Sequence, residues 1–189
     1  SQHCFRPRVQ RTLVTAKEIK TVKDIMAENH KDFPTLNLPP VTLKLQTGAD
    51  GVERVWDPLR KKYVALTPEE WVRQHFVNWL ITERKFPASL LGNEVGIHLN
   101  GMSRRCDTIA FGRDTKPLVI VEYKAPDVKI TQDVFDQIVR YNMVLHAQYL
   151  VVSNGLNHYC CRIDYAGNTY HFIPRIPQYA EIALPFSEQ

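Results

Sequence analysis

The sequence lacks the features that mark membrane proteins, secreted proteins and small domains held by zinc or disulfides. No apolar run approaches the roughly 20 residues that a membrane helix needs, and the N-terminus has no short apolar core of a secretory signal. The few cysteines show no C-x-x-C spacing, so the sequence predicts neither a zinc site nor a disulfide framework. We interpret them as buried thiols, which favours a reducing compartment and a cytoplasmic location; they are Cys4, Cys106, Cys160 and Cys161.

Two further kinds of site are missing from the sequence. There is no phosphate-binding G-x-x-x-x-G-K-S/T sequence, so no P-loop ATPase motor is predicted within the 189 residues. The seven histidines do not cluster at the spacing of metal ligands, and we interpret them as structural or surface residues. Neither a motor nor a histidine-bound metal is therefore expected.

The composition is that of a globular protein with a basic leading third. Hydrophobic residues make up 44% and charged residues 23%, values that exclude a disordered or fibrous chain. Residues 1–66 carry 12 Lys and Arg against 7 Asp and Glu, whereas residues 67–189 carry 12 against 13. A basic arm is compatible with nucleic-acid binding, although charge of this density is most often a solvated surface.

The chain divides by pattern into three parts. Residues 1–33 form an N-terminal extension in which Thr15 and Glu18 make a capping box for a helix that continues to Met26. Residues 34–66 are a lead-in, in which a proline-rich linker (34–40) precedes a hairpin of strands 41–46 and 52–56. Residues 67–189 are the main domain.

The main domain begins with the strongest helix signal in the sequence, "LTPEEWVRQHFVNWLITERKFP". Thr67 is a suitable N-cap, Pro68 occupies the first helical position, and Glu70 completes a capping box. An apolar stripe follows until Pro87 ends the pattern; it contains Trp71, Val72, Phe76, Trp79 and Leu80.

The rest of the domain alternates between strands and one more helix. Three strands come first, then a helix from Thr131 to His146, one strand and a terminal hairpin. This order (α-β-β-β-α-β with a C-terminal hairpin) predicts an α/β fold with a central mixed sheet flanked by helices. The expected strands lie at 93–99, 104–111, 118–124, 148–153, 158–164 and 169–176.

Three of these strands carry polar groups where buried strands rarely have them. Asp107 interrupts the run from 105 to 111, and Glu122 and Lys124 end an apolar strand two residues apart, on the same side of the chain. Glu94 points away from the apolar residues of the first strand. On the second helix, polar Gln137 lies four residues before Tyr141 and shares a face with it.

Two carboxylates and a lysine at the ends of adjacent strands suit metal-assisted hydrolysis of a phosphodiester. Asp107 and Glu122 would hold Mg²⁺, or Mn²⁺, because such ions prefer oxygen ligands and keep several waters. Lys124 would orient the attacking water or stabilise the negative charge that develops. The alternative for Glu122 and Lys124 is a surface ion pair, and for Asp107 a turn or capping residue.

These motifs resemble a known nuclease family. "CD…VEYK", with fifteen residues from Asp107 to Glu122, and "QIVRY" are similar to the motifs of the PD-(D/E)XK nuclease superfamily. Over roughly residues 35–180 the chain resembles the N-terminal domain of type I restriction enzyme R subunits. The resemblance implies a restriction-endonuclease-like core. One departure is Cys106, which stands where the motif has proline.

The resemblance also implies roles for single residues. Asp107 and Glu122 would be metal ligands and Lys124 the catalytic lysine, while Gln137 and Tyr141 would fill the accessory motif. An additional acid would come from Glu94 or Glu70, although capping explains Glu70 equally well. Three arginines are expected to contact nucleic acid, with solvated surface charge as the alternative; they are Arg104, Arg105 and Arg140.

Two functions follow as expectations. The first is a Mg²⁺-dependent DNA endonuclease of restriction or repair type, stand-alone without an ATPase motor, although a fragment of a longer polypeptide is the other interpretation. Its expected partners are DNA, other restriction-system subunits in trans and a second copy in a homodimer, with no membrane. The alternative is a non-catalytic nucleic-acid-binding or assembly module. The intact Asp, Glu and Lys favour the nuclease, and the nearly neutral main domain favours the module.

Overall fold

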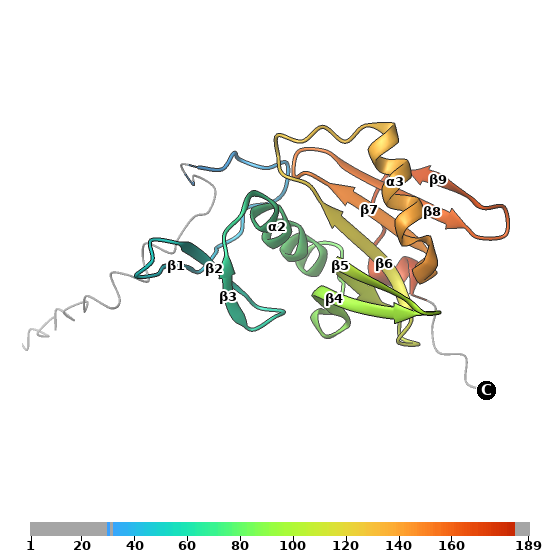
Figure 1. The fold of residues 1–189 in the computed structure, drawn as a ribbon, viewed down its shortest axis with the longest axis horizontal. Coiled ribbons are helices and arrows are strands. Elements are labelled where there is room, and N and C mark those ends of the chain that lie inside the picture. Colours follow the sequence, from blue (N-terminus) through green and yellow to red (C-terminus); the bar gives the residue numbers. More distant parts are fainter. Residues whose placement is uncertain (1–29, 31, 184–189) are drawn as a thin grey trace, which may run out of the picture.

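The computed structural model describes residues 30 and 32–183, and its main element is a six-stranded sheet (Figure 1). Its strands follow one another in chain order, and every neighbouring pair is antiparallel except β6 and β7, which are parallel. The predicted mixed sheet is therefore confirmed. The strands are β4 (Leu91–Leu99), β5 (Met102–Phe111), β6 (Pro117–Tyr123), β7 (Tyr149–Ser153), β8 (His158–Asp164) and β9 (Thr169–Ile173).

Helices α2 (Pro68–Thr82) and α3 (Gln132–Asn142) cover opposite faces of this sheet. Successive residues of a strand point to opposite faces, so β6 contributes to two cores. Val121 packs in the core that contains α2, whereas Ile120 packs in the core that contains α3. The run from 118 to 121 is buried throughout, as its apolar sequence predicts.

Helix α2 begins at the predicted cap. The Glu70 amide donates to Thr67 Oγ1 at 3.1 Å, and Pro68 lies in the first turn. The Glu70 side chain does not return to the cap but points toward Arg60 and Gln74, so only half of the predicted capping box forms. The residues from 70 to 77 are all buried, which means that α2 is covered on more than its sheet-facing side.

The segment before the first strand provides part of that cover. The Phe33 ring stacks on the Trp71 ring with centroids 5.3 Å apart, and Trp71 Nε1 donates to the Pro34 carbonyl at 3.1 Å. Leu36 is buried in the same core. The proline-rich segment at 34–40 is thus packed against α2. The division into three parts stays a prediction, and the expected helix at 15–26 lies outside the described residues.

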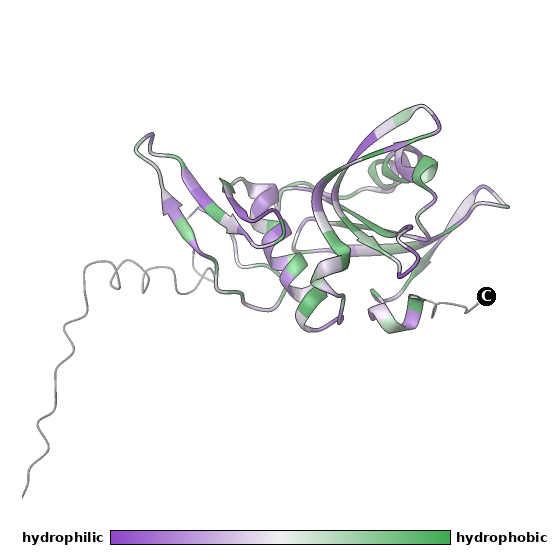
Figure 2. Ribbon diagram, turned by 90° about the horizontal axis from the view of Figure 1, so that it is seen from below, coloured by the Kyte–Doolittle hydropathy of each residue, from purple (hydrophilic) through white to green (hydrophobic). Residues whose placement is uncertain are grey.

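A second, three-stranded sheet precedes α2. It has the order β1-β2-β3, with both pairs antiparallel, and it lies at the opposite end of the molecule from the β8–β9 turn (Figures 1 and 2). Only a hairpin was expected here, and the first expected strand, 41–46, was placed too early. The third strand was missed because it is only four residues long and follows a tight turn in which Lys61 adopts a left-handed conformation (φ 53°). The strands are β1 (Leu45–Thr47), β2 (Glu53–Asp57) and β3 (Lys62–Ala65).

The remaining differences concern short elements. Helix α3 ends at Asn142, four residues before the predicted end, because a 3-10 turn, η3 (Met143–Leu145), follows and His146 adopts a left-handed conformation (φ 53°). Another 3-10 turn, η2 (Ala88–Leu90), precedes β4, and the short helix α4 (Tyr179–Ile182) follows β9. The three described cysteines are free and buried, as expected. Within the described residues, no helix is long and apolar enough to span a membrane.

The double burial of β6 generates a stability prediction. Val121 is 0% exposed at the centre of the sheet, whereas Val52 is 41% exposed in the β1–β2 turn. Val121→Ala should lower the free energy of unfolding by about 2 kcal/mol, because it removes two buried methyl groups and leaves a cavity. Val52→Ala, the same chemical change, should alter it by less than about 0.5 kcal/mol. Urea unfolding measures both, and equal effects would contradict the placement of β6.

Candidate active site

Asp107 and Glu122 lie opposite each other where β5 and β6 separate. The paired register ends at Thr108 and Val121, and its continuation places Asp107 against Glu122. At this point a side chain replaces the backbone ladder, because the Tyr123 amide donates to Asp107 Oδ2 at 2.9 Å. The carboxyl of Asp107 is thus fixed beside the end of β6.

The position of Glu122 beside Asp107 changes the ionisation of Glu122. Burial raises the pKa of Glu122, the negative charge of Asp107 and a hydrogen bond with it raise the pKa further, and the result is about 8. The amide of Asn142 and the ammonium of Lys124 act in the opposite direction. At neutral pH Glu122 therefore retains its proton.

Lys124 is the first residue after β6. Its amide donates to the Ser153 carbonyl at 2.9 Å, so the backbone continues along β7 for one more residue. The side chain is half-buried and close enough to Glu122 to lower that group's pKa. The predicted set of Asp107, Glu122 and Lys124 is thus brought together in space.

Asn142 is a member of this site that the sequence interpretation missed. It lies on the buried face of α3 with Phe135 and Val139, forms a hydrogen bond with Glu122, and donates from Nδ2 to the Ile138 carbonyl at 2.9 Å. Its Oδ1 is buried and has no hydrogen-bond partner among the described residues. The available signal was a polar residue at the i+7 position of an apolar stripe that begins at Phe135.

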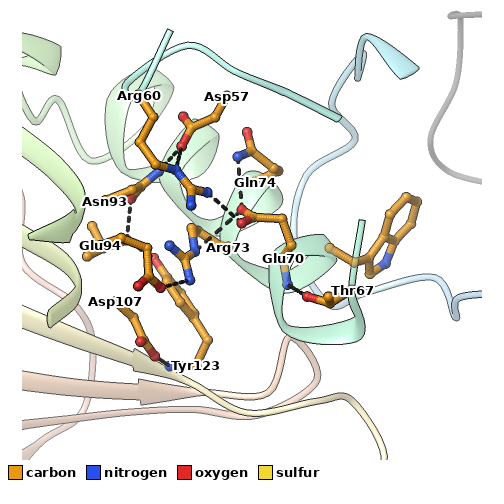
Figure 3. A network of polar contacts seen from close by, with 12 residues as sticks. Asp57, Arg60, Thr67, Glu70, Arg73, Gln74, Asn93, Glu94, Asp107 and Tyr123 are labelled. Atoms are coloured by element: carbon orange, nitrogen blue, oxygen red, sulfur yellow. Dashed lines mark hydrogen bonds and ion pairs between the residues drawn. The ribbon is translucent and has the colours of Figure 1, made fainter. Parts of the chain in front are cut away.

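The two candidate additional acids, Glu70 of α2 and Glu94 of β4, are both paired with arginines (Figure 3). Glu94 is in register with Asp107 but has a positive φ of 54°, and it accepts from Arg73 and Arg105 at 2.6 Å each. Burial raises its pKa, but these two guanidinium groups outweigh burial and hold the pKa below its ordinary value. Glu70 accepts from Arg60 and lies 3.4 Å from Arg73. Both carboxylates are occupied by arginines.

The residues expected to contact nucleic acid lie around α3 and the end of β5. The Arg104 guanidinium lies 4.1 Å from the centre of the Tyr141 ring, and its Nε donates to the Tyr141 carbonyl at 3.1 Å. Arg105 is occupied by Glu94. Gln137 and Arg140 are exposed on α3. The roles of these residues stay predictions, as do those of Glu70 and Glu94.

The carboxyl groups of Asp107 and Glu122 are the donor groups at this site that suit a divalent cation. Across residues 30 and 32–183 no group of three or more His, Cys, Asp or Glu side chains gathers at metal-binding distance. Mg²⁺ in phosphate-processing sites is held by one or two carboxylates together with waters and substrate phosphates. The two adjoining carboxyl groups of Asp107 and Glu122 are a donor set of this kind, so the residues present fit such an ion.

Comparison with known proteins identifies the family. Residues 68–177 match the family model described as the N terminus of type I restriction enzyme R proteins (HSDR_N). The chain belongs to this family. The matched region of this HSDR_N protein begins at the start of α2 and includes every predicted site residue, whereas the small sheet precedes it. The predicted resemblance to the R-subunit N-terminal domain is thus confirmed.

Among solved structures, the HSDR_N protein is similar to a fragment of a putative HsdR subunit of a type I restriction enzyme from Vibrio vulnificus YJ016. The two share 19% sequence identity with a TM-score of 0.44, and the match covers 62% of this chain and 24% of that one. The chain therefore spans about a quarter of that fragment. No curated protein matches the sequence significantly.

The carboxyl contact predicts how Asp107 controls Glu122. Asp107→Asn removes a neighbouring negative charge, so the pKa of Glu122 should fall from about 8 toward its ordinary value. Titration of the Glu122 side-chain carboxyl by carbon-13 NMR measures this shift. Asp164→Asn, the same change at an exposed residue at the end of β8, serves as the control. An unchanged midpoint in Asp107→Asn would refute the contact.

The same pKa predicts a pH-dependent stability. A carboxyl whose folded pKa is raised stabilises the fold fully below its ordinary pKa of 4.5, and this contribution is lost as the pH rises to about 8. Glu122→Gln does not ionise, so its free energy of unfolding relative to the wild type should rise on the order of 3 kcal/mol between pH 4 and pH 8. Urea unfolding across this pH range measures the difference. A constant difference would show that Glu122 ionises normally.

Proposed function

We propose that this chain is a catalytic PD-(D/E)XK nuclease domain that hydrolyses DNA phosphodiester bonds with Mg²⁺. The observation that carries the proposal is the contact of Asp107 with Glu122 at the split between β5 and β6, with Lys124 next to Glu122 at the strand end. Membership of the R-protein N-terminal family supports a role in a restriction system.

Asp107 and Glu122 would hold the cation, with Mn²⁺ as an alternative to Mg²⁺. When bound, such an ion neutralises charge on a phosphate and makes a water more acidic. The chain supplies the geometry for this: the Tyr123 amide fixes Asp107, and the Asn142 amide holds Glu122 from the α3 side. Both carboxylates therefore face a common point at the end of β6.

Lys124 would serve the reacting phosphate directly. Its ammonium lies near Glu122 in a half-buried position, where a positive charge stabilises developing negative charge more strongly than in water. It would also orient the attacking water by donating a hydrogen bond to it. Around this centre, Arg104 and Arg140 would contact DNA phosphates. Gln137 and Tyr141 on α3 would position the DNA strand beside them.

The proposed context is a cytoplasmic restriction system. Other subunits of that system are the expected partners in trans, and any ATP-driven movement on DNA would come from outside these 189 residues, which contain no P-loop sequence. Cleavage of both strands would be achieved by a homodimer or by two successive nicks. Asp107, Glu122 and Lys124 all come from the same chain, so each copy in a homodimer would carry a complete carboxylate–lysine set.

The alternative is a non-catalytic DNA-binding or assembly module with the same fold. One observation favours it: residues 67–189 carry 12 basic against 13 acidic residues, whereas DNA affinity depends largely on neutralising phosphates. The intact carboxylate pair and Lys124 favour catalysis. Cleavage and metal binding, measured together, separate the two functions.

The nuclease proposal predicts metal-dependent cleavage of supercoiled plasmid. The purified protein should nick or linearise the plasmid with Mg²⁺ or Mn²⁺, and Glu122→Ala and Lys124→Ala should each reduce the rate by at least about a hundredfold. Glu69→Ala and Lys116→Ala are matched controls at exposed residues and should retain the wild-type rate. Gel separation of the plasmid forms over time measures all five proteins.

If the protein does not cleave the plasmid, calorimetric titration with Mn²⁺ shows which explanation applies. An absence of both cleavage and metal binding would overturn the nuclease proposal and support the module. Metal binding that is lost in Glu122→Ala, without cleavage, would indicate a nuclease that needs another subunit. Wild-type cleavage that persists in Glu122→Ala would place the chemistry elsewhere.

A further inference from the structure

Glu94, Asp107 and Glu122 occupy opposed positions on β4, β5 and β6, and these three positions are called the row of acids below. A continuous chain of buried hydrogen bonds runs beside the row. Its three central members are Asn93, Thr108 and Tyr123, the immediate sequence neighbours of these acids. The Tyr123 hydroxyl donates to Thr108 Oγ1 at 2.9 Å, and the Thr108 hydroxyl donates to Asn93 Oδ1 at 2.6 Å. All three side chains are at least 94% buried. These hydrogen bonds thus link β4, β5 and β6 on the α2 side of the sheet. Figure 3 labels the two outer members, Asn93 and Tyr123.

Asp57 sets the direction of every bond in this chain. Asp57 is completely buried and accepts from Asn93 Nδ2 at 3.1 Å, from the Leu59 amide at 2.8 Å and from Arg60 Nε. Because an ionised carboxylate only accepts, the Asn93 amide must turn its nitrogen toward Asp57 and its oxygen toward Thr108. The Thr108 hydrogen is then committed to Asn93, and the Tyr123 hydroxyl has to donate to Thr108.

Charge keeps Asp57 ionised in this buried position. Burial raises its pKa, but the hydrogen bonds from Arg60, Asn93 and the Leu59 amide outweigh burial and hold the pKa below its ordinary value. Arg60 also donates to Glu70 of α2, so the anchor connects β2 with both α2 and β4. The small sheet is therefore connected to the candidate site through a fully paired set of polar groups.

The hydrogen-bond chain lies where the backbone pairing between β5 and β6 ends. Backbone pairing of β5 with β6 ends at Thr108 and Val121, so the strands could separate further just where Asp107 and Glu122 face each other. The Tyr123–Thr108 bond crosses this gap on the α2 side, and the bond from the Tyr123 amide to Asp107 crosses it between backbone and side chain. The Tyr123 ring is also held by Phe76, 5.7 Å away between ring centres.

We propose that Asn93, Thr108 and Tyr123 are positioning residues of the candidate site. Their hydrogen-bond chain, anchored on Asp57, holds the ends of β5 and β6 together so that Asp107 keeps its bond to the Tyr123 amide and stays opposite Glu122. The catalytic consequence rests on the proposed nuclease function, whereas the positioning of Asp107 does not. A displacement of about 1 Å in a catalytic group is enough to lower a rate substantially.

The test interrupts the hydrogen-bond chain by substitutions that leave every candidate catalytic residue in place. Thr108→Val has nearly the same shape but no hydroxyl, Thr108→Ser restores the hydroxyl, and Tyr123→Phe removes one donor. Tyr179→Phe is the matched control, because Tyr179 is also 3% exposed and donates one hydrogen bond, to the Phe111 carbonyl at 3.1 Å, away from the row. Both Tyr→Phe variants lose a buried bond, but only Tyr123→Phe should affect the site.

The first measurement is native-state hydrogen exchange, which needs no activity. The amide of residue 123 should exchange at least about tenfold faster in Thr108→Val and Tyr123→Phe, with the Ile120 and Val151 amides unchanged. Thr108→Ser and Tyr179→Phe should keep the wild-type rate at residue 123. Unchanged protection of residue 123 in Thr108→Val would overturn the proposal, as would equal acceleration of all three amides, which indicates general destabilisation.

The second measurement is plasmid cleavage with Mn²⁺ by the same proteins. Thr108→Val should lower kcat on the order of tenfold while KM for DNA changes less than about twofold, and Thr108→Ser should recover most of the rate. Accelerated exchange with unchanged kcat in an active enzyme would overturn the catalytic consequence. If the wild type does not cleave DNA, the exchange result still decides whether the chain positions Asp107, and only the nuclease function fails.

Discussion

The contact between the carboxyl groups of Asp107 and Glu122 is the constraint to which the surrounding structure responds. Burial raises the pKa of Glu122, and the negative charge of Asp107 raises it further, to about 8. A free strand end would relax by moving the two groups apart. Here the Tyr123 amide holds Asp107, the Asn142 amide holds Glu122, and the core on each side of β6 prevents the strand from shifting. The fold therefore holds together two carboxyl groups that would otherwise move apart.

Because side chains alternate along β5 and β6, the positioning residues Thr108 and Tyr123 lie on one face of the sheet and the candidate catalytic residues Asp107 and Glu122 on the other. Residues of the α2 side form the hydrogen-bond chain that ends at Asp57, and their immediate neighbours form the candidate site. Each peptide bond between these neighbours transmits position directly, since a strand has little freedom within one residue. A rigid, fully paired polar layer behind the site thus fixes the carboxylates more precisely than the apolar packing of α3 would by itself. The small sheet has a reason to be present, because it supplies Asp57 and the loop residue Arg60 that neutralises it.

Local sequence patterns predicted most of this fold but only part of the site. The strands and both main helices follow from apolar periodicity, and Asp107, Glu122 and Lys124 were visible because polar groups interrupt buried strands. Asn142 was not predicted, since its partner Glu122 lies twenty residues away in the sequence. The pairing of Glu94 with Arg73 and of Asp57 with Asn93 was equally hidden, because these contacts join residues 21 and 36 positions apart. Strand β3 was missed for a different reason: its four residues are too few to show an alternating pattern, and only pairing with β2 makes it a strand.

The third acid of the row shows why register alone does not define a metal site. Glu94 is in register with Asp107, and by position it would complete a set of three carboxylates. Its positive φ and its bonds to Arg73 and Arg105 turn it toward α2 instead. Turning the Glu94 side chain toward Asp107 would leave the buried Arg73 with only Glu70, 3.4 Å away. It would also add a negative charge beside Glu122, whose pKa is already raised by Asp107. Loss of one partner from a buried ion pair costs about 3–5 kcal/mol, so the arginines hold the site at two carboxylates.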